Sequence, residues 1–304
     1  MAFEAFAPAK VNLFLHVGPL AADGYHPICS LIVFADVGDR LRLTPRGAPP
    51  FRIDGPFGAG LDADESNLVM RARQAILARA ALGLPPFALT LTKRLPLAGG
   101  LGGGSSDAAA ALVLIDRALS LRLGSDALAE LAADLGADVP ACLAGRPVVA
   151  KGRGQHLEAG PSLPVLDAVL INPGVASPTA EVFAAFDRVK PRTAPDDPPR
   201  AEVYETPREV ADFLANCRND LEAPAVARDG VIGETLSLLS RQPETLISRL
   251  SGSGATCFAL CAGALEARTL ADRLRALRPR WWITPCRLGG PWGPGGIADA
   301  TTPP

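Results

Sequence analysis

The sequence predicts an α+β protein of two domains, and three observations support that prediction. The chain has 304 residues, of which 48% are hydrophobic, which is ample for a buried core, and this length suggests two domains or one large one. Segments with the period of a strand are mixed with segments with the period of a helix, but the two do not alternate as βαβ units would. The pattern restarts after residue 155, so we expect domains at 1–155 and 156–288 and a disordered tail at 289–304.

The first domain opens with the alternating stretch AKVNLFLHV, residues 9–17. Its odd-numbered positions are apolar and Lys10 and Asn12 lie on the other face, which predicts a half-buried strand. Two strands should follow, joined by a turn at Gly38 and Asp39. The other expected elements are a helix at 66–82 with Ser66 as its N-cap, a strand at 87–96, helices at about 105–120 and 125–135, and a strand at about 147–151.

The second domain begins with the strand VLDAVLINPG, residues 165–174. Residues 190–207 contain five prolines and charges of both signs, which predicts a surface loop. The other expected elements are helices near 207–217, 219–228 and 230–240, a strand–turn–strand unit at 248–263, a helix at 264–277 and a final strand at 281–287.

The composition excludes several classes of function. The net charge is −2, so no basic excess points to nucleic acid or to an anionic membrane surface. We find no signal peptide, no apolar run of 18 residues and no zinc-like spacing among the three histidines. The six cysteines form no C-x-x-C pair, and we expect them to be reduced and mostly buried. These features predict a cytoplasmic protein without a nucleic-acid or membrane partner. We expect a monomer or a homodimer, between which the sequence does not decide.

The most informative stretch is LAGGLGGGSSD, which has five glycines in the six positions 99–104. It is not a Walker A loop, because Ser105 stands where the lysine belongs, and the Rossmann pattern is also broken. Glycines nevertheless let a backbone approach a bulky anion, and Ser105, Ser106 and Asp107 are good N-cap residues for the apolar helix that follows. A tight strand–helix crossing needs one or two glycines, and each further one costs roughly 0.5–1 kcal/mol. We therefore favour a phosphate site at this helix N-terminus.

Three other features allow two interpretations. The turn SGSGA, 251–255, is an ordinary hairpin loop unless it faces the first glycine loop. Asp138, in LGADVPACL, either caps a helix or is a partly buried carboxylate that takes a proton. Lys10 either faces solvent or serves a site. A simple turn explains neither Tyr25 nor His26 in the segment DGYHP.

Taken together and in chain order, five segments resemble the GHMP kinase superfamily, which includes homoserine, mevalonate and galactose kinases. They are PAKVNLFLHV, ADGYHPI, LPLAGGLGGGSSDAAAAL, LGADVP and SRLSGSGATCFA, and the resemblance covers about residues 6–287. DGYH beside PAKVNL is similar to the branch that phosphorylates the 2-hydroxyl of a cytidine-diphosphate-linked methylerythritol in non-mevalonate isoprenoid biosynthesis. The resemblance implies ATP with Mg²⁺, a ribosomal S5 domain 2-like N-terminal domain, a ferredoxin-like C-terminal domain and an active site in the cleft between them.

The resemblance also implies a role for each matching residue. Asp138 matches the catalytic aspartate and Lys10 the lysine beside it, whereas the metal ligands are not indicated. The positions that match nucleotide-binding residues are Asn67, Lys93, Pro96, Leu97, Ala98, Gly99, Gly100, Leu101, Gly102, Gly103, Gly104, Ser105 and Ser106. The positions that match substrate-binding residues are Asn12, Tyr25, His26, Phe183, Gly252, Ser253 and Gly254.

Two alternatives stay open at this point. Another small-alcohol kinase of the superfamily, of the homoserine or mevalonate type, would share the loop and the Lys10–Asp138 pair. It would have no use for Tyr25, His26 and Phe183. A nucleotide-binding regulator without catalysis is disfavoured because the matching motifs are complete. The chain departs from the family pattern at Pro27, directly after DGYH, and residues 190–207 and the tail after 288 look particular to this chain.

Overall fold

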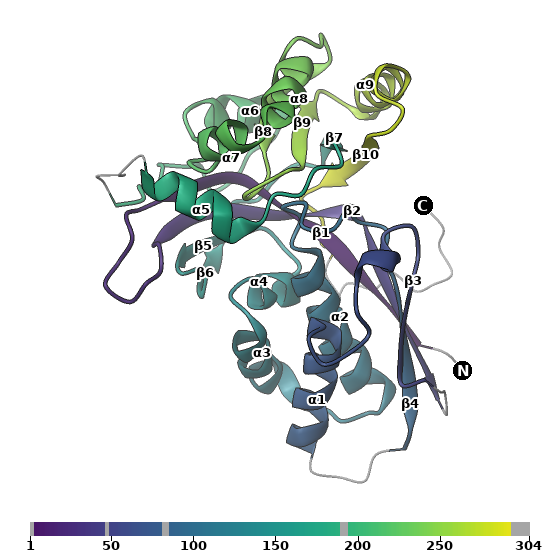
Figure 1. Ribbon diagram of the computed structural model, residues 1–304. Coiled ribbons are helices and arrows are strands. Elements are labelled where there is room, and N and C mark those ends of the chain that lie inside the picture. Colours follow the sequence, from purple (N-terminus) through teal and green to yellow (C-terminus); the bar gives the residue numbers. More distant parts are fainter. Residues whose placement is uncertain (1–2, 46–48, 81–84, 189–193, 293–304) are drawn as a thin grey trace.

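The computed structural model describes residues 3–45, 49–80, 85–188 and 194–292 (Figure 1). Its strands are β1 Phe3–Val17, β2 Ile28–Pro45, β3 Phe51–Asp54, β4 Phe87–Thr92, β5 Val148–Gly152, β6 His156–Ala159, β7 Leu166–Asn172, β8 Thr245–Leu250, β9 Cys257–Cys261 and β10 Trp282–Leu288. They form one mixed sheet in the order β3-β4-β2-β10-β7-β9-β8, in which β1 and β5 also pair with β2, and β6 pairs with β5. The pairing of Leu288 with Ala35 joins the N-terminal strands to the C-terminal ones.

The helices fall into two groups on either side of the long β1–β2 ribbon (Figure 1). α1 to α4 lie below the ribbon in this view, and α6 to α9 lie above it. α2 packs on β1 and β2, and α9 packs on β7 and β10. The helices are α1 Leu68–Ala80, α2 Gly103–Ala118, α3 Gly124–Leu135, α4 Val139–Ala144, α5 Thr179–Arg188, α6 Pro207–Ala215, α7 Glu222–Arg228, α8 Gly230–Ser240 and α9 Ala264–Leu277, with a 3-10 turn at Gly58–Gly60.

β2 is one continuous strand, so the predicted turn at Gly38 and Asp39 is wrong. Gly38 pairs with Pro8 of β1, and a Cβ atom on Gly38 would lie 2.2 Å from the carbonyl oxygen of Ala7. The glycine therefore serves a close approach of two strands beside a register shift in β1, between Pro8 and Lys10. Asp39 points inward and is fully buried.

β1 is buried on both faces, although its alternating pattern predicted one exposed face. Val11 and Leu13 belong to a core cluster that includes Leu170 and Phe258 of the C-terminal half. The edge of β1 that faces away from β2 is covered by loops, because Lys10 N–H donates to Leu101 O, at 2.8 Å. An edge strand covered in this way leaves no pairing surface, and its polar side chains become internal groups that need partners.

The start of α1 also differs from the prediction. Ser66 donates to Asp64 rather than capping the helix, and the side-chain oxygen of Asn67 accepts the N–H of Val69 at 3.0 Å. An Asn side chain caps a helix as well as a Ser side chain does, so the sequence alone could not separate the two. β3, β6, α4 and α5 were not predicted, because short elements carry little periodicity.

The predicted domain boundary at 155/156 lies in the turn of the β5–β6 hairpin, in which Lys151 pairs with His156. A division after Ala159 keeps that hairpin whole. All six cysteines are free and buried, as predicted. The part of the predicted loop that the structure describes, residues 194–206, contains no helix or strand longer than a bridge, and the predicted tail lies outside the described residues from 293 onward. No helix of the described ranges is long and apolar enough to span a membrane.

Candidate active site

The glycine loop ends in an uncapped helix. The N-cap of α2 is Gly102, at φ 60°, which has no side chain to accept the first helical N–H groups. The predicted capping residues Ser105, Ser106 and Asp107 lie inside the helix instead, as its third to fifth residues. The Ser106 hydroxyl is buried and has no hydrogen-bond partner among the described residues. Open amides and an unpartnered hydroxyl at the positive end of a helix are suited to an anion.

The two glycine-rich turns lie against one another. A Cβ atom on Gly100 would lie 2.3 Å from the carbonyl oxygen of Ser251 and 2.9 Å from the nitrogen of Gly254. The Ser251 hydroxyl donates to Gly100 O at 2.9 Å, and Thr256 N–H donates to Gly99 O at 3.0 Å. The second turn therefore faces the first loop, which is the condition for assigning it more than a hairpin role.

Lys10 and Asp138 form an ion pair beside the loop. Lys10 Nζ lies 3.1 Å from Asp138 Oδ2, and the two side chains are 7% and 43% exposed. Asp138 occupies the N-cap position of α4, but its side chain accepts no capping hydrogen bond. The helix-capping interpretation is thus excluded for Asp138 within the described residues. Its carboxylate is charge-paired on one side and open to solvent on the other.

Hydrogen bonds and packing hold Lys10 in place. Its ammonium also donates to Asn12 Oδ1 at 3.0 Å, and Asn12 Nδ2 donates to Ser30 Oγ at 2.7 Å. A Cβ atom on Gly102 would lie 2.9 Å from Lys10 Cε. The end of the glycine loop therefore rests on the lysine stem, and the Lys10–Asp138 pair lies at the N-terminus of α2.

Lys93 takes a different position from the one expected of a nucleotide-binding residue. It is 2% exposed, and its ammonium binds Asp107 Oδ2 at 2.7 Å and also Asp39. Asp39 accepts the N–H of Leu95 at 2.9 Å. Because Leu95 precedes the glycine loop and Asp107 follows it, this triad ties the two ends of the loop together from beneath.

Burial dominates the electrostatics of the triad. It raises the pKa of Asp107 to about 7, against the charge of Lys93, which opposes the rise. Burial alone would lower the pKa of Lys93, but the charges of Asp107 and Asp39 outweigh it and raise the pKa. Asp107 Oδ1 has no hydrogen-bond partner among the described residues. Two buried carboxylates, those of Asp39 and Asp107, thus share the single ammonium group of Lys93.

The structure brings only some of the predicted substrate-binding residues into contact with one another. The His26 and Phe183 rings stack at 5.0 Å between centroids, and His26 Nδ1 lies 2.8 Å from Gly18 O. Tyr25 is 56% exposed, and the Arg153 guanidinium covers its ring at 4.4 Å. The structure therefore pairs Phe183 with His26 and pairs Tyr25 with a residue that the sequence analysis did not single out. Arg153 lies in a turn distant in sequence from Tyr25, and no local signal links the two.

The second glycine turn connects to the helix that carries Phe183. Ser253 Oγ lies 3.0 Å from Thr179 Oγ1, at the first residue of α5, and Ser253 O accepts the Ser177 hydroxyl at 2.7 Å. A Cβ atom on Gly252 would lie 3.3 Å from Asn12 Oδ1. The turn is thus placed between the Lys10 environment and α5.

A cavity of about 420 Å³ opens beside the start of the glycine loop. Its size suits a nucleoside, and it is separate from the Lys10–Asp138 pair. No group of three or more His, Cys, Asp or Glu side chains that could hold a metal ion occurs in the described part of the chain. The cavity is lined by residues that include Phe57, Gly60, Pro96, Leu97, Val175, Arg280 and Trp282.

Comparisons with known proteins agree with this geometry. Residues 67–146 match the family model described as GHMP kinases N terminal domain. A 4-diphosphocytidyl-2-C-methyl-D-erythritol kinase of Caulobacter sp. (strain K31) is 54% identical over 96% of this chain and 100% of its own length.

Solved structures extend the likeness to the fold. A crystal structure of 4-(cytidine 5'-diphospho)-2C-methyl-D-erythritol kinase is 33% identical, with a TM-score of 0.75, and covers 94% of this chain and 99% of its own. A homoserine kinase from Cytophaga hutchinsonii, 19% identical over 95% of this chain and 94% of its own with a TM-score of 0.62, shares the fold. The chain therefore belongs to the 4-diphosphocytidyl-2-C-methyl-D-erythritol kinase family of the GHMP kinases.

Proposed function

We propose that this protein phosphorylates the 2-hydroxyl of 4-diphosphocytidyl-2-C-methyl-D-erythritol, with ATP as the phosphoryl donor, for isoprenoid precursor biosynthesis. The observation that carries the proposal is the Lys10–Asp138 pair, whose half-exposed carboxylate lies at the end of an open glycine loop. High identity to relatives of that name across nearly the whole chain supports the same function. A homoserine or mevalonate kinase is not favoured, and neither is a regulator without catalysis.

The residues of the loop fit a triphosphate. The N–H groups of the first turn of α2 lack a capping side chain, and the buried Ser106 hydroxyl lacks a partner among the described residues. When bound, ATP supplies the phosphoryl group, and Mg²⁺ would offset the charge of its phosphates. Residues Pro96 to Ser106 would hold the phosphates through backbone amides and hydroxyls. The cavity beside Pro96 and Leu97 would receive the nucleoside, whereas Lys93 supports the loop from below.

Asp138 and Lys10 would act on the acceptor alcohol. Asp138 accepts or directs the proton of the 2-hydroxyl, and its solvent-facing side leaves room for that alcohol. Lys10 holds the carboxylate in place through the ion pair and adds positive charge where negative charge accumulates on the reacting oxygens. Asn12 holds the ammonium in position through its side-chain oxygen.

The cytosine would be recognised by residues near the C-terminal end of β1. Phe183 and Tyr25 offer ring faces, each worth about 1–3 kcal/mol by analogy with base stacking on aromatic side chains. His26 would offer Nε2, which lies 3.4 Å from Asp187 Oδ1, because its Nδ1 is engaged with Gly18 O. Gly252 to Gly254 would shape the space between the base and Lys10. In this arrangement the substrate would lie between the N-terminal S5-like part and the C-terminal ferredoxin-like part. A cytoplasmic location and a monomeric or homodimeric state are further predictions, and the mass in solution tests the latter.

The experiment that tests the function is ADP release by the purified protein with Mg-ATP and a panel of acceptors. The panel contains the cytidine-diphosphate-linked methylerythritol, mevalonate, homoserine and galactose. We expect turnover with the cytidine compound alone. Turnover with another alcohol would overturn the substrate assignment and the roles of Tyr25, His26 and Phe183. ATP binding without turnover on any acceptor would overturn catalysis.

A further inference from the structure

A proline-rich segment lies across the end of β1, next to the turn that carries His26. It comprises residues 195–200, and we call it the brace. Beyond it, the Tyr204 N–H donates to Ser162 O at 3.0 Å, and Ser162 N–H donates to Glu202 O at 2.8 Å. The brace is therefore followed by a short stretch of strand-like pairing, and its described residues are tied to the fold rather than free in solvent.

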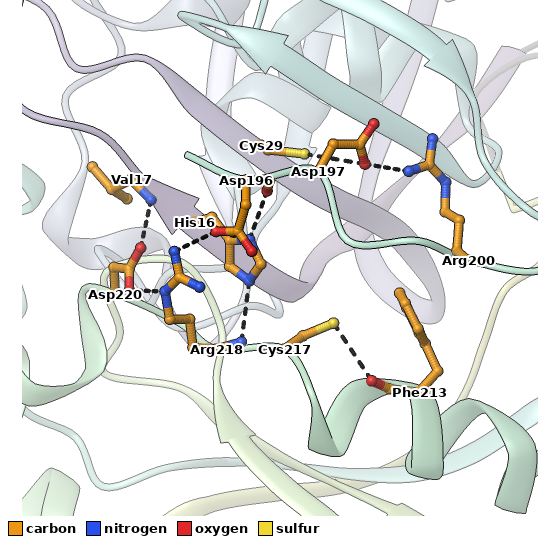
Figure 2. Close-up of polar contacts among 10 residues, drawn as sticks. All are labelled: His16, Val17, Cys29, Asp196, Asp197, Arg200, Phe213, Cys217, Arg218 and Asp220. Carbon is orange, nitrogen blue, oxygen red and sulfur yellow. Dashed lines mark hydrogen bonds and ion pairs between the residues drawn. The ribbon is translucent and has the colours of Figure 1, made fainter. Parts of the chain in front are cut away.

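The first anchor of the brace is Asp196, which lies between His16 and Arg218 (Figure 2). His16 is fully buried, its Nδ1 lies 2.8 Å from the backbone oxygen of Asp196, and its Nε2 accepts the N–H of Arg218 at 3.2 Å. A carbonyl oxygen can only accept, so His16 carries its proton on Nδ1 here. The Arg218 guanidinium donates to the Asp196 carboxylate at 2.5 Å. Asp196 is thus held through its backbone and its side chain by two different elements.

The same arginine connects this anchor to β1. Arg218 Nε donates to Asp220 Oδ1 at 2.6 Å, and Asp220 Oδ2 accepts the N–H of Val17 at 2.7 Å (Figure 2). Val17 is the last residue of β1 and directly precedes Gly18. The anchor therefore fixes the end of β1, where the chain enters the turn that carries His26.

The second anchor is Asp197. Its carboxylate lies 2.8 Å from Lys151 Nζ on β5. It also pairs with Arg200 within the brace (Figure 2). These groups are partly exposed, and isolated surface pairs of this kind contribute little to folding stability. They can nevertheless set the position of a short segment that is already held at Asp196 and at Tyr204.

The brace contacts the turn that carries His26 through Pro195. A Cβ atom on Gly18 would lie 2.7 Å from Pro195 Cδ and 2.8 Å from Pro27 Cγ, so Gly18 fits between two proline rings. Gly18 also accepts from the His26 ring at its oxygen and donates to Pro27 O at 2.8 Å. Pro27 and Pro195 of the brace thus both lie against Gly18, whose oxygen accepts from the His26 ring. The other ring nitrogen, His26 Nε2, lies 3.4 Å from Asp187 Oδ1 on α5.

We propose that the brace positions His26 for the nucleobase, and that Asp196 is a positioning residue for the cytidine half of the substrate. The inference rests on the proposed function and adds to it a group that touches neither the base nor the reacting atoms. Displacing Asp196 would release Pro195 from Gly18, whose carbonyl oxygen accepts from the His26 ring, and would widen the range of His26 orientations. Because Lys10, Asp138 and the glycine loop have no contact with the brace among the contacts described, the effect should fall on the cytidine substrate and not on ATP.

The test is the steady-state kinetics of Asp196→Lys, which places a cation against Arg218 and His16. We expect KM for the cytidine substrate to rise about tenfold, while kcat and KM for ATP stay within about twofold. Asp196→Glu keeps the charge and should restore most of the wild-type KM. Asp272→Lys is the matched control, because Asp272 is also an exposed carboxylate paired with an arginine, Arg275, but on α9. It should leave all three constants unchanged.

The outcomes separate this inference from the proposed function. If the wild-type protein does not turn over the cytidine compound, the proposed function fails. If it does, and Asp196→Lys leaves KM for that compound unchanged or raises KM for ATP equally, the positioning role is wrong. Should Asp196→Lys not fold, Asp196→Asn and Pro195→Gly replace it, with cytidine diphosphate binding measured by calorimetry. Wild-type affinity in both would also refute the proposal, and weaker binding in both would support it.

Discussion

Two lysines contact the glycine loop, and they use the same chemistry for opposite purposes. Lys10 lies against Gly102 and pairs with Asp138, whose side chain is 43% exposed. Lys93 lies against the next residue, Gly103, with its Nζ 3.2 Å from where a Cβ atom would be. Its two carboxylate partners are sealed from solvent. One ion pair is open to a substrate, and the other ties the loop to the fold.

The difference lies in what surrounds each acid and not in the pairing itself. Asp138 has one side free, so its charge can act on a bound alcohol. Asp39 and Asp107 both form ion pairs with Lys93, and Asp39 also accepts two backbone N–H groups at the start of the loop. Removing the Asp138 carboxylate from the open pair should therefore lower kcat. Removing the Lys93 charge from the buried triad should instead lower the free energy of unfolding.

The largest expected effect is on the open pair. Asp138→Asn removes the proton acceptor while keeping the size of the side chain, and kcat should fall by about 10²–10⁴. The midpoint of thermal unfolding should change little, since the side chain is half exposed and caps no helix. Turnover in the ADP-release assay measures this, with Asp134→Asn on the exposed face of α3 as the control. Wild-type kcat in Asp138→Asn would remove the catalytic assignment.

The second effect is on the buried triad. Lys93→Met leaves two buried carboxylates without a cation, and the free energy of unfolding should fall by about 3–5 kcal/mol. Urea unfolding measures it. Lys151→Met is a matched control, because Lys151 also pairs with two acids, Glu158 and Asp197, but with partly exposed groups. A much smaller loss is expected there. Equal losses in the two variants would contradict the distinction between buried and open pairs.

The sequence could predict the open pair but not the buried triad. PAKVNL, LGADVP and the glycine loop are local motifs, and their residues meet as the motifs imply. Lys93 lies 54 residues from Asp39 and 14 from Asp107, and nothing local shows that the three converge. Instead, Asp39 beside Gly38 suggested a turn, because a Gly-Asp pair is more common in turns than in the middle of a paired strand. The fold, and not the motif, makes this aspartate a partner of Lys93.

The arrangement of the secondary structure was predictable to a similar extent. The long periodic helices α2 and α9 were predicted to within two residues of their bounds, whereas β1 begins six residues before its predicted start at Ala9. The burial of β1 on both faces was not predictable, because α2 and residues of the C-terminal half such as Leu170 and Phe258, all distant in sequence, pack on it. The pairing of Arg153 with Tyr25 was also missed, because the two residues are distant in sequence and no local pattern links them.

A third prediction concerns the glycine that rests on Lys10. Gly102→Ala imposes a left-handed backbone on alanine, which costs about 1–2 kcal/mol, and it also pushes a methyl group onto Lys10 Cε. Gly124→Ala is the control, since Gly124 has φ +83° with nothing within 4 Å of the added Cβ atom. Both variants should lose similar stability, but only Gly102→Ala should lose kcat. Equal kcat in the two would show that Lys10 tolerates the displacement.

The smallest predicted effect is a pH dependence that the triad gives to folding. Burial raises the pKa of Asp107 to about 7, above its ordinary value of 3.8. Between those two values the folded protein holds a proton that the unfolded chain has released, so stability is lost as pH rises through the folded pKa. From pH 6 to pH 8 this group should remove about 1 kcal/mol from the free energy of unfolding.

Asp107→Asn keeps the shape of the side chain and cannot ionise, so its unfolding free energy should change less over that range than that of the wild-type protein. Urea unfolding at pH 6, 7 and 8 compares the two slopes, and other titrating groups cancel because both proteins contain them. Parallel curves would mean that Asp107 stays ionised beside Lys93 over this pH range. A flatter curve for Asp107→Asn would show that one buried ammonium cannot hold two ionised carboxylates near neutral pH, whereas the open Lys10 has a single acid to hold.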